Sequence, residues 1–164
     1  MRKKIVASIL MVAVAVMTFA GCGNKENAGG TANLEGSCEE ILTKVYENAE
    51  LDADFREAMG YFQTTPVTED MEEYILGTTD VDYTDSVYSA PMMSSIAYQC
   101  VVLRLEADEN VEEAKQLLLD KADPIKWVCV EAESVIVENV GDVILYIMAD
   151  ETTAEAIKTA FLAL

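Results

Sequence analysis

Hydrophobic positions along the chain recur at two spacings, one typical of helices and one typical of strands. In three segments, apolar residues three and four positions apart form one stripe, which predicts a helix. Each segment opens with a capping-box pattern, a small polar residue followed three positions later by glutamate. These segments are residues 37–49, 110–123 and 152–164. Residues 51–59 are expected to add helical turns to the first, and Thr68 and Gly77 bracket a short helix over 69–76.

Runs rich in β-branched residues predict strands between these helices. A short strand over 87–90 and a longer one over 96–105 are separated by a bend at 91–95. The run 96–105 is almost continuously apolar, as in a strand buried on both faces. Turn residues at 139–142 join strand candidates over 127–138 and 143–149 into a hairpin.

The resulting order of elements is α-α-β-β-α-β-β-α, which places the domain in the α+β class. The economical arrangement is a mostly antiparallel sheet of three to four strands, covered on one side by helices. No internal repeat is visible in the sequence.

The first 22 residues have the layout of a bacterial lipoprotein signal. Three basic residues at positions 2–4 precede an uncharged, mostly apolar run over 5–20, and Gly21 leads directly into Cys22. In such signals the peptide is cut before the cysteine, whose thiol is acylated and becomes the new N-terminus. Stable anchoring takes about two acyl chains, so a diacylated Cys22 would hold the protein durably at a membrane.

Two other interpretations of this segment remain open. A transmembrane helix needs about 20 apolar residues, and the run here is shorter and is followed at once by polar residues. An ordinary cleaved signal would release a soluble protein. Phe19 stands where the lipoprotein pattern most often has leucine, which leaves that interpretation available.

The sequence therefore predicts three parts: a lipoprotein signal peptide over 1–21, a flexible tether over 22–36, and a single α+β domain over 37–164. The tether is rich in Gly, Asn and Ala and has little to bury; its 14 residues after Cys22 span roughly 20 Å on average. The domain is long enough to enclose a hydrophobic core of its own.

The charge of the chain limits its partners. The signal holds three basic residues and no acidic one, so eight basic and 30 acidic residues remain after its removal, a formal net charge of −22. Such a surface repels nucleic acid and anionic lipid headgroups, and we expect no nucleic-acid partner. The acidic excess either attracts cations or a basic partner, or keeps the domain soluble.

The three remaining cysteines are Cys38, Cys100 and Cys129, and no two of them form a C-x-x-C pattern. The sequence therefore indicates neither a zinc site nor a disulfide framework. Cys100 and Cys129 lie in strand-like runs, where a free cysteine commonly acts as a small hydrophobe. A disulfide between these two remains possible, since export permits one.

Little in the chain points to catalysis. It contains no histidine, which excludes Ser-His and Cys-His pairs and the usual zinc sites, and no glycine-rich phosphate loop. Paired carboxylates, as in glycosidases, remain an alternative. Asp80, Asp82 and Thr84 fall where a calcium loop places ligands, but Asp85 and Pro91 occupy the positions that require Gly and Glu. A solvated acidic loop is the better interpretation, and we expect no metal, cofactor or catalytic residue.

Two further features allow a structural and a binding interpretation. Trp127, the only tryptophan, opens a strand candidate and is expected in the core, although it could stack on a ligand. Met92 and Met93 are expected to fill the bend beside the sheet, or else to line an adaptable binding surface.

Residues 91–93 (PMM), 123–127 (DPIKW) and 139–143 (NVGDV) carry a resemblance to a known family. The chain resembles a family of small Gram-positive lipoproteins whose conserved domain has no assigned function. The resemblance covers the domain from Ser37 onward, and the signal and tether agree with it. It implies an exported, lipid-anchored α+β domain and offers no activity or ligand.

From these observations we expect an extracytoplasmic lipoprotein, attached to the cell membrane through Cys22, that acts as a binding or interaction module and not as an enzyme. The alternative is a carboxylate-dependent hydrolase of the cell envelope. A third hypothesis is a structural lipoprotein stabilised by calcium.

Overall fold

A computed structural model describes residues 33–93 and 95–164. In these residues five α-helices and one antiparallel sheet make up the domain, so the predicted α+β class is confirmed. The helices are α1 (Cys38–Asn48), α2 (Ala53–Ala58), α3 (Glu72–Leu76), α4 (Val111–Lys121) and α5 (Glu151–Leu162), with a 3₁₀ turn, η1 (Met59–Tyr61), after α2. Over the part of the chain that the structure describes, no helix has both the length and the apolar character needed to span a bilayer.

The sheet has five strands, one more than the upper bound of the prediction. They are β1 (Phe62–Thr65), β2 (Tyr83–Pro91), β3 (Gln99–Leu105), β4 (Ser134–Val140) and β5 (Val143–Ala149). Their order across the sheet is β1-β2-β3-β5-β4, and every neighbouring pair is antiparallel. β3 and β5 therefore lie in the interior of the sheet, and β1 and β4 form its edges.

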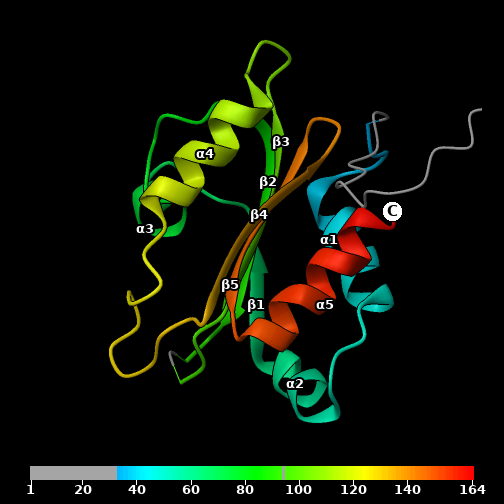
Figure 1. The fold of residues 1–164 in the computed structure, drawn as a ribbon, viewed down its shortest axis with the longest axis vertical. Helices are drawn as coiled ribbons and strands as arrows, with labels where there is room; N and C mark the ends of the chain where they lie inside the picture. The colour runs from blue at the N-terminus through cyan, green and yellow to red at the C-terminus, as the bar shows by residue number, and fades with distance from the viewer. Residues whose placement is uncertain (1–32, 94) are drawn as a thin grey trace, which may run out of the picture.

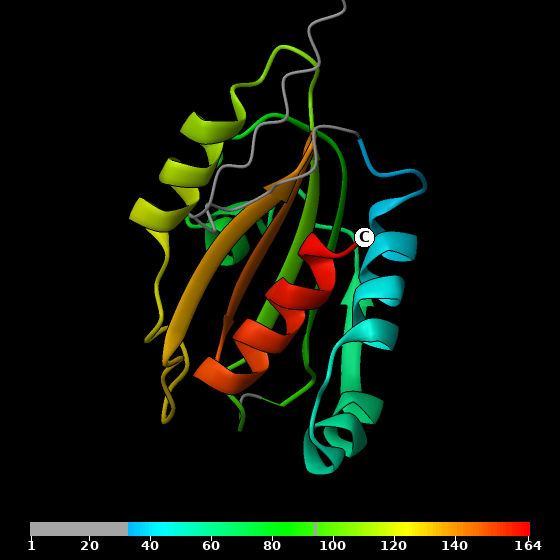
Figure 2. The ribbon, with the colours of Figure 1, turned by 45° about the vertical axis from the view of Figure 1, so that its right-hand side comes forward.

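Helices cover both faces of this sheet, so the predicted one-sided cover is wrong. α1, α2 and α5 lie on one face, and α3 and α4 lie on the other (Figures 1 and 2). The core is accordingly divided into two clusters by the sheet. One joins α1 and α5 to one side of the strands, through residues such as Val45, Leu145 and Phe161. The other joins α3 and α4 to the opposite side, through residues such as Leu76 and Leu118.

Burial on two faces explains the composition of the central strands. All seven residues of β5 are buried, as are all residues of β3 except Arg104. A strand covered on both faces must be apolar at successive positions instead of alternating. The interpretation of the run ending at Leu105 as a doubly buried strand is therefore confirmed, although β3 begins at Gln99, three residues later than predicted.

Local capping fixes where most helices begin. The predicted capping box at Ser37 is present: its side chain accepts from the Glu40 amide and the Glu40 carboxylate accepts from the Ser37 amide. Asn110 caps α4 as predicted. The predicted cap at Thr152 is wrong, because Asp150 accepts a bond from the Thr153 amide and α5 begins at Glu151. Thr68 likewise does not cap α3, which begins at Glu72, four residues after it.

The longest predicted strand is the largest error in the secondary structure. Of residues 127–138, only those from Ser134 onward belong to β4, and the first seven lie in the loop between α4 and β4. The hairpin that follows is confirmed, with β4 and β5 joined at Gly141 and Asp142 and Gly141 at a φ of 59°. At the other side of the sheet, β2 begins at Tyr83, so the predicted acidic loop over 80–85 is partly strand.

Candidate functional site

The two ends of the sheet have different surroundings, and they define two poles of the domain. At one end, Arg104 of β3 and Asp142 beside β5 form an ion pair of 3.0 Å, and the chain from Asn33 joins them; we call this the N-terminal pole. The opposite end, where β2 finishes and β3 and β4 begin, carries the loops of the candidate site; we call it the apolar pole. The poles lie at opposite ends of the long axis in Figure 1.

Cys22, the proposed lipidation site, lies outside the described residues, as do the predicted signal peptide and most of the predicted tether. The end of that tether belongs to the folded domain. The Arg104 guanidinium donates to the carbonyls of Leu34 (2.8 Å) and Gly36 (2.9 Å), and the Asp142 amide donates to the Asn33 side chain at 3.3 Å. Contacts with the folded domain therefore include Asn33, four residues before the predicted boundary at Ser37.

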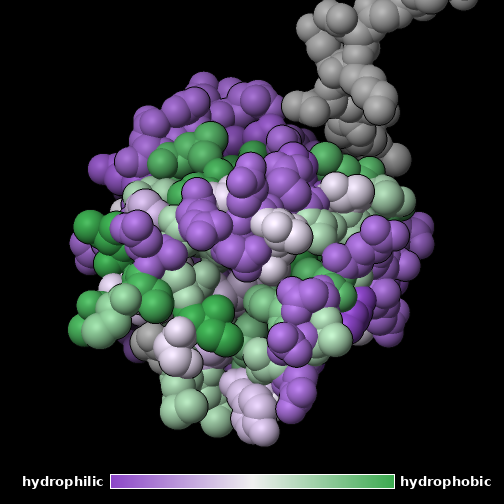
Figure 3. All heavy atoms as spheres, turned by 60° about the horizontal axis from the view of Figure 1, so that its bottom comes forward, coloured by the Kyte–Doolittle hydropathy of each residue, from purple (hydrophilic) through white to green (hydrophobic). Residues whose placement is uncertain are grey.

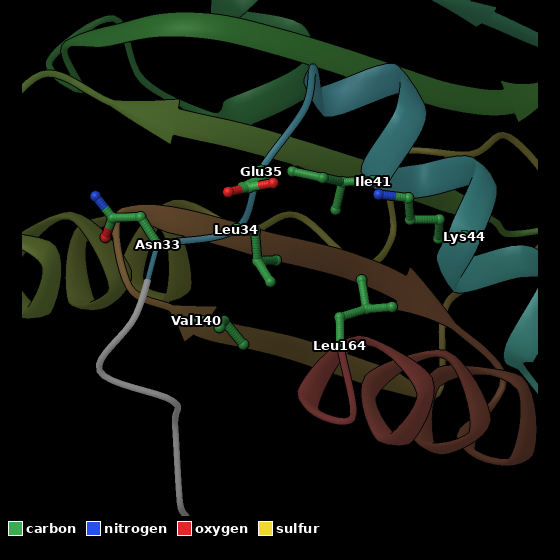
Figure 4. Close-up of a pocket in the computed structure, with 7 residues that line it drawn as sticks. All are labelled: Asn33, Leu34, Glu35, Ile41, Lys44, Val140 and Leu164. Carbon is green, nitrogen blue, oxygen red and sulfur yellow. The ribbon is translucent and has the colours of Figure 1, made fainter.

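A hollow of about 480 Å³ lies at the N-terminal pole, between the segment leading to α1, the end of β4 and the last residue of the chain (Figure 4). Four of its seven lining residues are apolar: Leu34, Ile41, Val140 and Leu164. Its charged groups are Glu35 and Lys44, one of each sign. The hollow can take an apolar group, but it does not offer the two carboxylates that glycoside hydrolysis requires.

At the apolar pole, the loop between α4 and β4 contains the DPIKW segment (residues 123–127), and hydrogen bonds within this loop hold its two ends together. The Asp123 carboxylate accepts a bond from the Ile125 amide at 3.1 Å, and the Ala132 amide donates to the Pro124 carbonyl at 2.9 Å. Trp127 is 8% exposed and belongs to the core cluster beneath α3 and α4, which confirms its predicted core position. The loop thus has a fixed base and a defined tip.

Lys126 fixes the same loop to the sheet and to α3. Its ammonium nitrogen Nζ donates to the Tyr74 carbonyl at 2.9 Å and makes a short hydrogen bond with Gln99 Oε1. Gln99 is fully buried at the start of β3, and its amide nitrogen donates to the Ile75 carbonyl at 2.8 Å. Nζ also lies 4.4 Å from the centroid of the Tyr74 ring, within cation–π range.

The tips of the loops at this pole expose hydrophobic side chains. Val128 is 92% exposed and Ile125 66%, and across from them Met92 and Met93 of the β2–β3 turn are 70% and 74% exposed. Tyr61, whose carbonyl accepts a bond from the Met92 amide, is also exposed. The prediction that the two methionines fill the bend is therefore wrong. Figure 3, in which this end of the molecule comes forward, shows hydrophobic side chains in several groups with hydrophilic ones among them.

Exposed carboxylates lie near these apolar side chains along the chain. Asp123, Glu131 and Glu133 are exposed on the loop that carries Val128, and Glu57 is exposed on α2, close to Tyr61 along the chain. An apolar centre with a charged rim is the usual anatomy of a protein-binding patch. The rim here is negative, in keeping with the charge of the whole chain.

The cysteines of the described residues are all free, and the possible disulfide between Cys100 and Cys129 is not formed. Cys100 is buried in β3, whereas Cys129 is exposed in the loop and not in a strand as predicted. Burial raises the pKa of the Cys100 thiol to about 12, and burial together with the nearby Asp85 carboxylate raises that of Cys38 to about 12. Both buried thiols are therefore kept in their unreactive neutral form at physiological pH.

The described residues do not contain a group of three or more His, Cys, Asp or Glu side chains arranged to hold a metal ion. Of the residues considered for calcium, Thr84 donates to the Arg104 carbonyl, and Asp85 accepts a bond of 2.7 Å from the Cys38 amide. Glu109, near the N-terminal pole, has a pKa raised by burial and by the carboxylates of Asp82, Asp108 and Glu113. Glu109 is half-buried, and the charged groups that raise its pKa are other carboxylates.

Comparison of the chain with known protein families, with curated proteins and with solved structures finds no match. The resemblance to a lipoprotein family therefore remains a prediction from the sequence. The candidate site at the apolar pole is therefore supported by its geometry alone. Gln99 and Tyr74, which hold its loop in place through Lys126, were not identified from the sequence. A glutamine at the start of an otherwise apolar run was the one available indication of a buried polar contact.

Proposed function

We propose that the protein is an extracytoplasmic lipoprotein, held at the membrane by acyl chains on Cys22, whose domain is a non-enzymatic interaction module. The observation that carries the second part is the apolar pole, where Val128, Ile125, Met92 and Met93 are exposed on two loops. Isolated surface hydrophobes are common, but several large ones gathered at one end of a domain are typical of an interaction surface.

The place where the N-terminal segment joins the domain supports an anchoring role for one end of the protein and a binding role for the other. Eleven residue steps separate Cys22 from Asn33. A chain of that length spans at most about 36–40 Å, whatever its conformation. A lipid on Cys22 would thus keep the N-terminal pole within about 40 Å of the bilayer, with the apolar pole at the opposite end of the strands.

The chemistry of the apolar pole favours a basic, amphipathic protein segment as the partner. The exposed methionines and aliphatic residues can adapt to apolar anchors, and methionine is common on such surfaces. The carboxylates of Asp123, Glu131 and Glu133 at the rim attract lysine and arginine side chains. The same rim, in a chain of strongly negative charge, repels an anionic bilayer.

A designed peptide tests this proposal. We expect an amphipathic leucine–lysine helix to bind the full-length protein held in neutral phosphatidylcholine nanodiscs, measured by fluorescence anisotropy. Replacing two apolar tips together, Val128→Gln with Met93→Gln, is expected to weaken binding at least about tenfold, because removal of central apolar anchors costs more than about 1 kcal/mol each.

The matched control is Leu119→Gln, which removes a hydrophobic side chain of α4 that is 41% exposed outside the apolar pole and is expected to leave binding unchanged. A leucine–glutamate peptide is expected not to bind. Equal affinity of the double variant and the unmodified protein would show that charge alone holds the peptide, and the proposed surface would be wrong.

A further inference from the structure

Lys126 has a second property besides fixing the loop. Its Nζ has two hydrogen-bond acceptors, the Tyr74 carbonyl and Gln99 Oε1. Among the described residues, no carboxylate lies within ion-pair distance of it, which is also true of Lys44, Arg56 and Lys121. Two acceptors satisfy both N–H groups of a neutral amine and leave its lone pair unused. An ammonium group has a third N–H to satisfy.

The surroundings also make the neutral form more accessible than in an exposed lysine, although the Tyr74 ring lies within cation–π range of Nζ. Burial lowers the pKa of Lys126 from its ordinary value of 10.5 to about 8, and the negative charge of Asp123 opposes this shift without cancelling it. A desolvated lysine with a lowered pKa is the form in which proteins use this side chain as a nucleophile.

A small hollow adjoins the amine. It measures about 120 Å³ and lies between the end of α3, the end of α4 and β5. Lys126 lines it together with Tyr74 and Tyr146. The charged groups that face it from the neighbouring elements are Glu73 of α3, Lys121 of α4 and Asp123 of the loop. The space accepts a molecule of a few heavy atoms, and the carboxylates supply groups able to exchange protons.

We propose that Lys126 is a nucleophilic amine that captures small aldehydes as an imine in this hollow. The lone pair of the neutral amine attacks the carbonyl carbon, a C–N bond forms, and the C=O π pair moves to oxygen. One N–H proton passes to that oxygen and gives a carbinolamine. The hydroxyl group then leaves with the second proton as water, and the nitrogen lone pair closes the C=N bond. Nothing is oxidised or reduced.

This inference is independent of the proposed binding role. The amine lies beneath the loop, whereas the apolar tips at Ile125 and Val128 point into solvent. A protein that failed to bind any basic peptide could still possess the reactive lysine, and the converse also holds.

The test is reductive trapping of the full-length protein with acetaldehyde and sodium cyanoborohydride, followed by peptide mapping of every lysine. At pH 7.5 we expect Lys126 to be alkylated at least about tenfold faster than Lys44 or Lys121, because its lowered pKa leaves a substantial fraction of this amine as nucleophilic free base. Its rate is expected to rise with pH and reach half its maximum near pH 8.

Lys121 serves as the internal control, since it lines the same hollow but is exposed. In concentrated urea the preference for Lys126 is expected to disappear, which shows that it depends on the fold. A rate for Lys126 no greater than that of Lys121 in the folded protein, or a rate that does not level off near pH 8, would overturn the proposal and leave Lys126 as a structural contact only.

Discussion

Replacing Phe161 by alanine is expected to lower the free energy of unfolding by about 3–5 kcal/mol, the range for truncating a buried aromatic side chain. Phe161 is fully buried in α5 and belongs to the same core cluster as Val45 of α1 and Leu145 of β5. Its loss leaves a cavity between a helix layer and the central strand, where dense packing allows little collapse. Urea denaturation, followed by the fluorescence of the buried Trp127, measures the change.

The control for this prediction is Thr159→Ala, at an exposed position of the same helix, which is expected to change stability by no more than about 0.5 kcal/mol. A loss of less than about 1 kcal/mol for Phe161→Ala would contradict the packing of α5 against the sheet. An unchanged denaturant slope would confirm that both proteins unfold between the same states.

Replacing Gly77 by alanine is expected to be the second most damaging of these changes. Gly77 ends α3 with a φ of 77°, a left-handed conformation that costs other residues about 1–2 kcal/mol. A Cβ atom placed there would lie 2.3 Å from the Lys121 carbonyl oxygen, so the end of α4 would have to move. Strain and displacement together should cost more than about 2 kcal/mol, again measured by urea denaturation.

Gly60 offers a matched control on the same chain, because a Cβ atom there would meet nothing within 4 Å. Gly60→Ala is expected to be close to neutral. Since Gly77 and Lys121 also line the hollow beside Lys126, Gly77→Ala should slow the alkylation of Lys126 as well. Similar stability of the two variants would mean that α3 and α4 do not meet as described.

The features that could be predicted from the sequence were those determined by neighbouring residues. The capping box of Ser37 and Glu40 acts within one helical turn, and Gly77 ends a helix through its own backbone conformation. The apolar run of β5 marked a buried strand because seven successive hydrophobic residues have few other uses in a soluble domain.

Features that depend on distant contacts could not be predicted in the same way. β1 has only four residues and no apolar alternation, and it exists because it pairs with the end of β2. The run from Trp127 has strand composition, but Pro124 and the bonds of Asp123 hold it in a closed loop. The prediction of helices on only one side of the sheet was wrong because the apolar stripe of a helix shows that one of its faces is buried. It does not show which side of the sheet that face packs against.

The same limit applies to the candidate site. The DPxKW element was visible in the sequence, but the partners of Lys126 lie 27 and 52 residues away along the chain. Only the fold brings Gln99 and Tyr74 to its amine. The exposure of Met92 and Val128 could not be predicted either, because apolar residues in a bend or strand are more often buried than exposed.

The central claim is that the domain is displayed from a membrane through a lipid on Cys22. The direct measurement is the intact mass, with N-terminal peptide mapping, of the native protein recovered from the membrane fraction of its cells. Our account predicts a chain that begins at Cys22 and carries the added mass of acyl chains on that residue. Recovery of the protein from the cytosol with residues 1–21 still attached, or from the membrane with an unmodified Cys22 thiol, would contradict it.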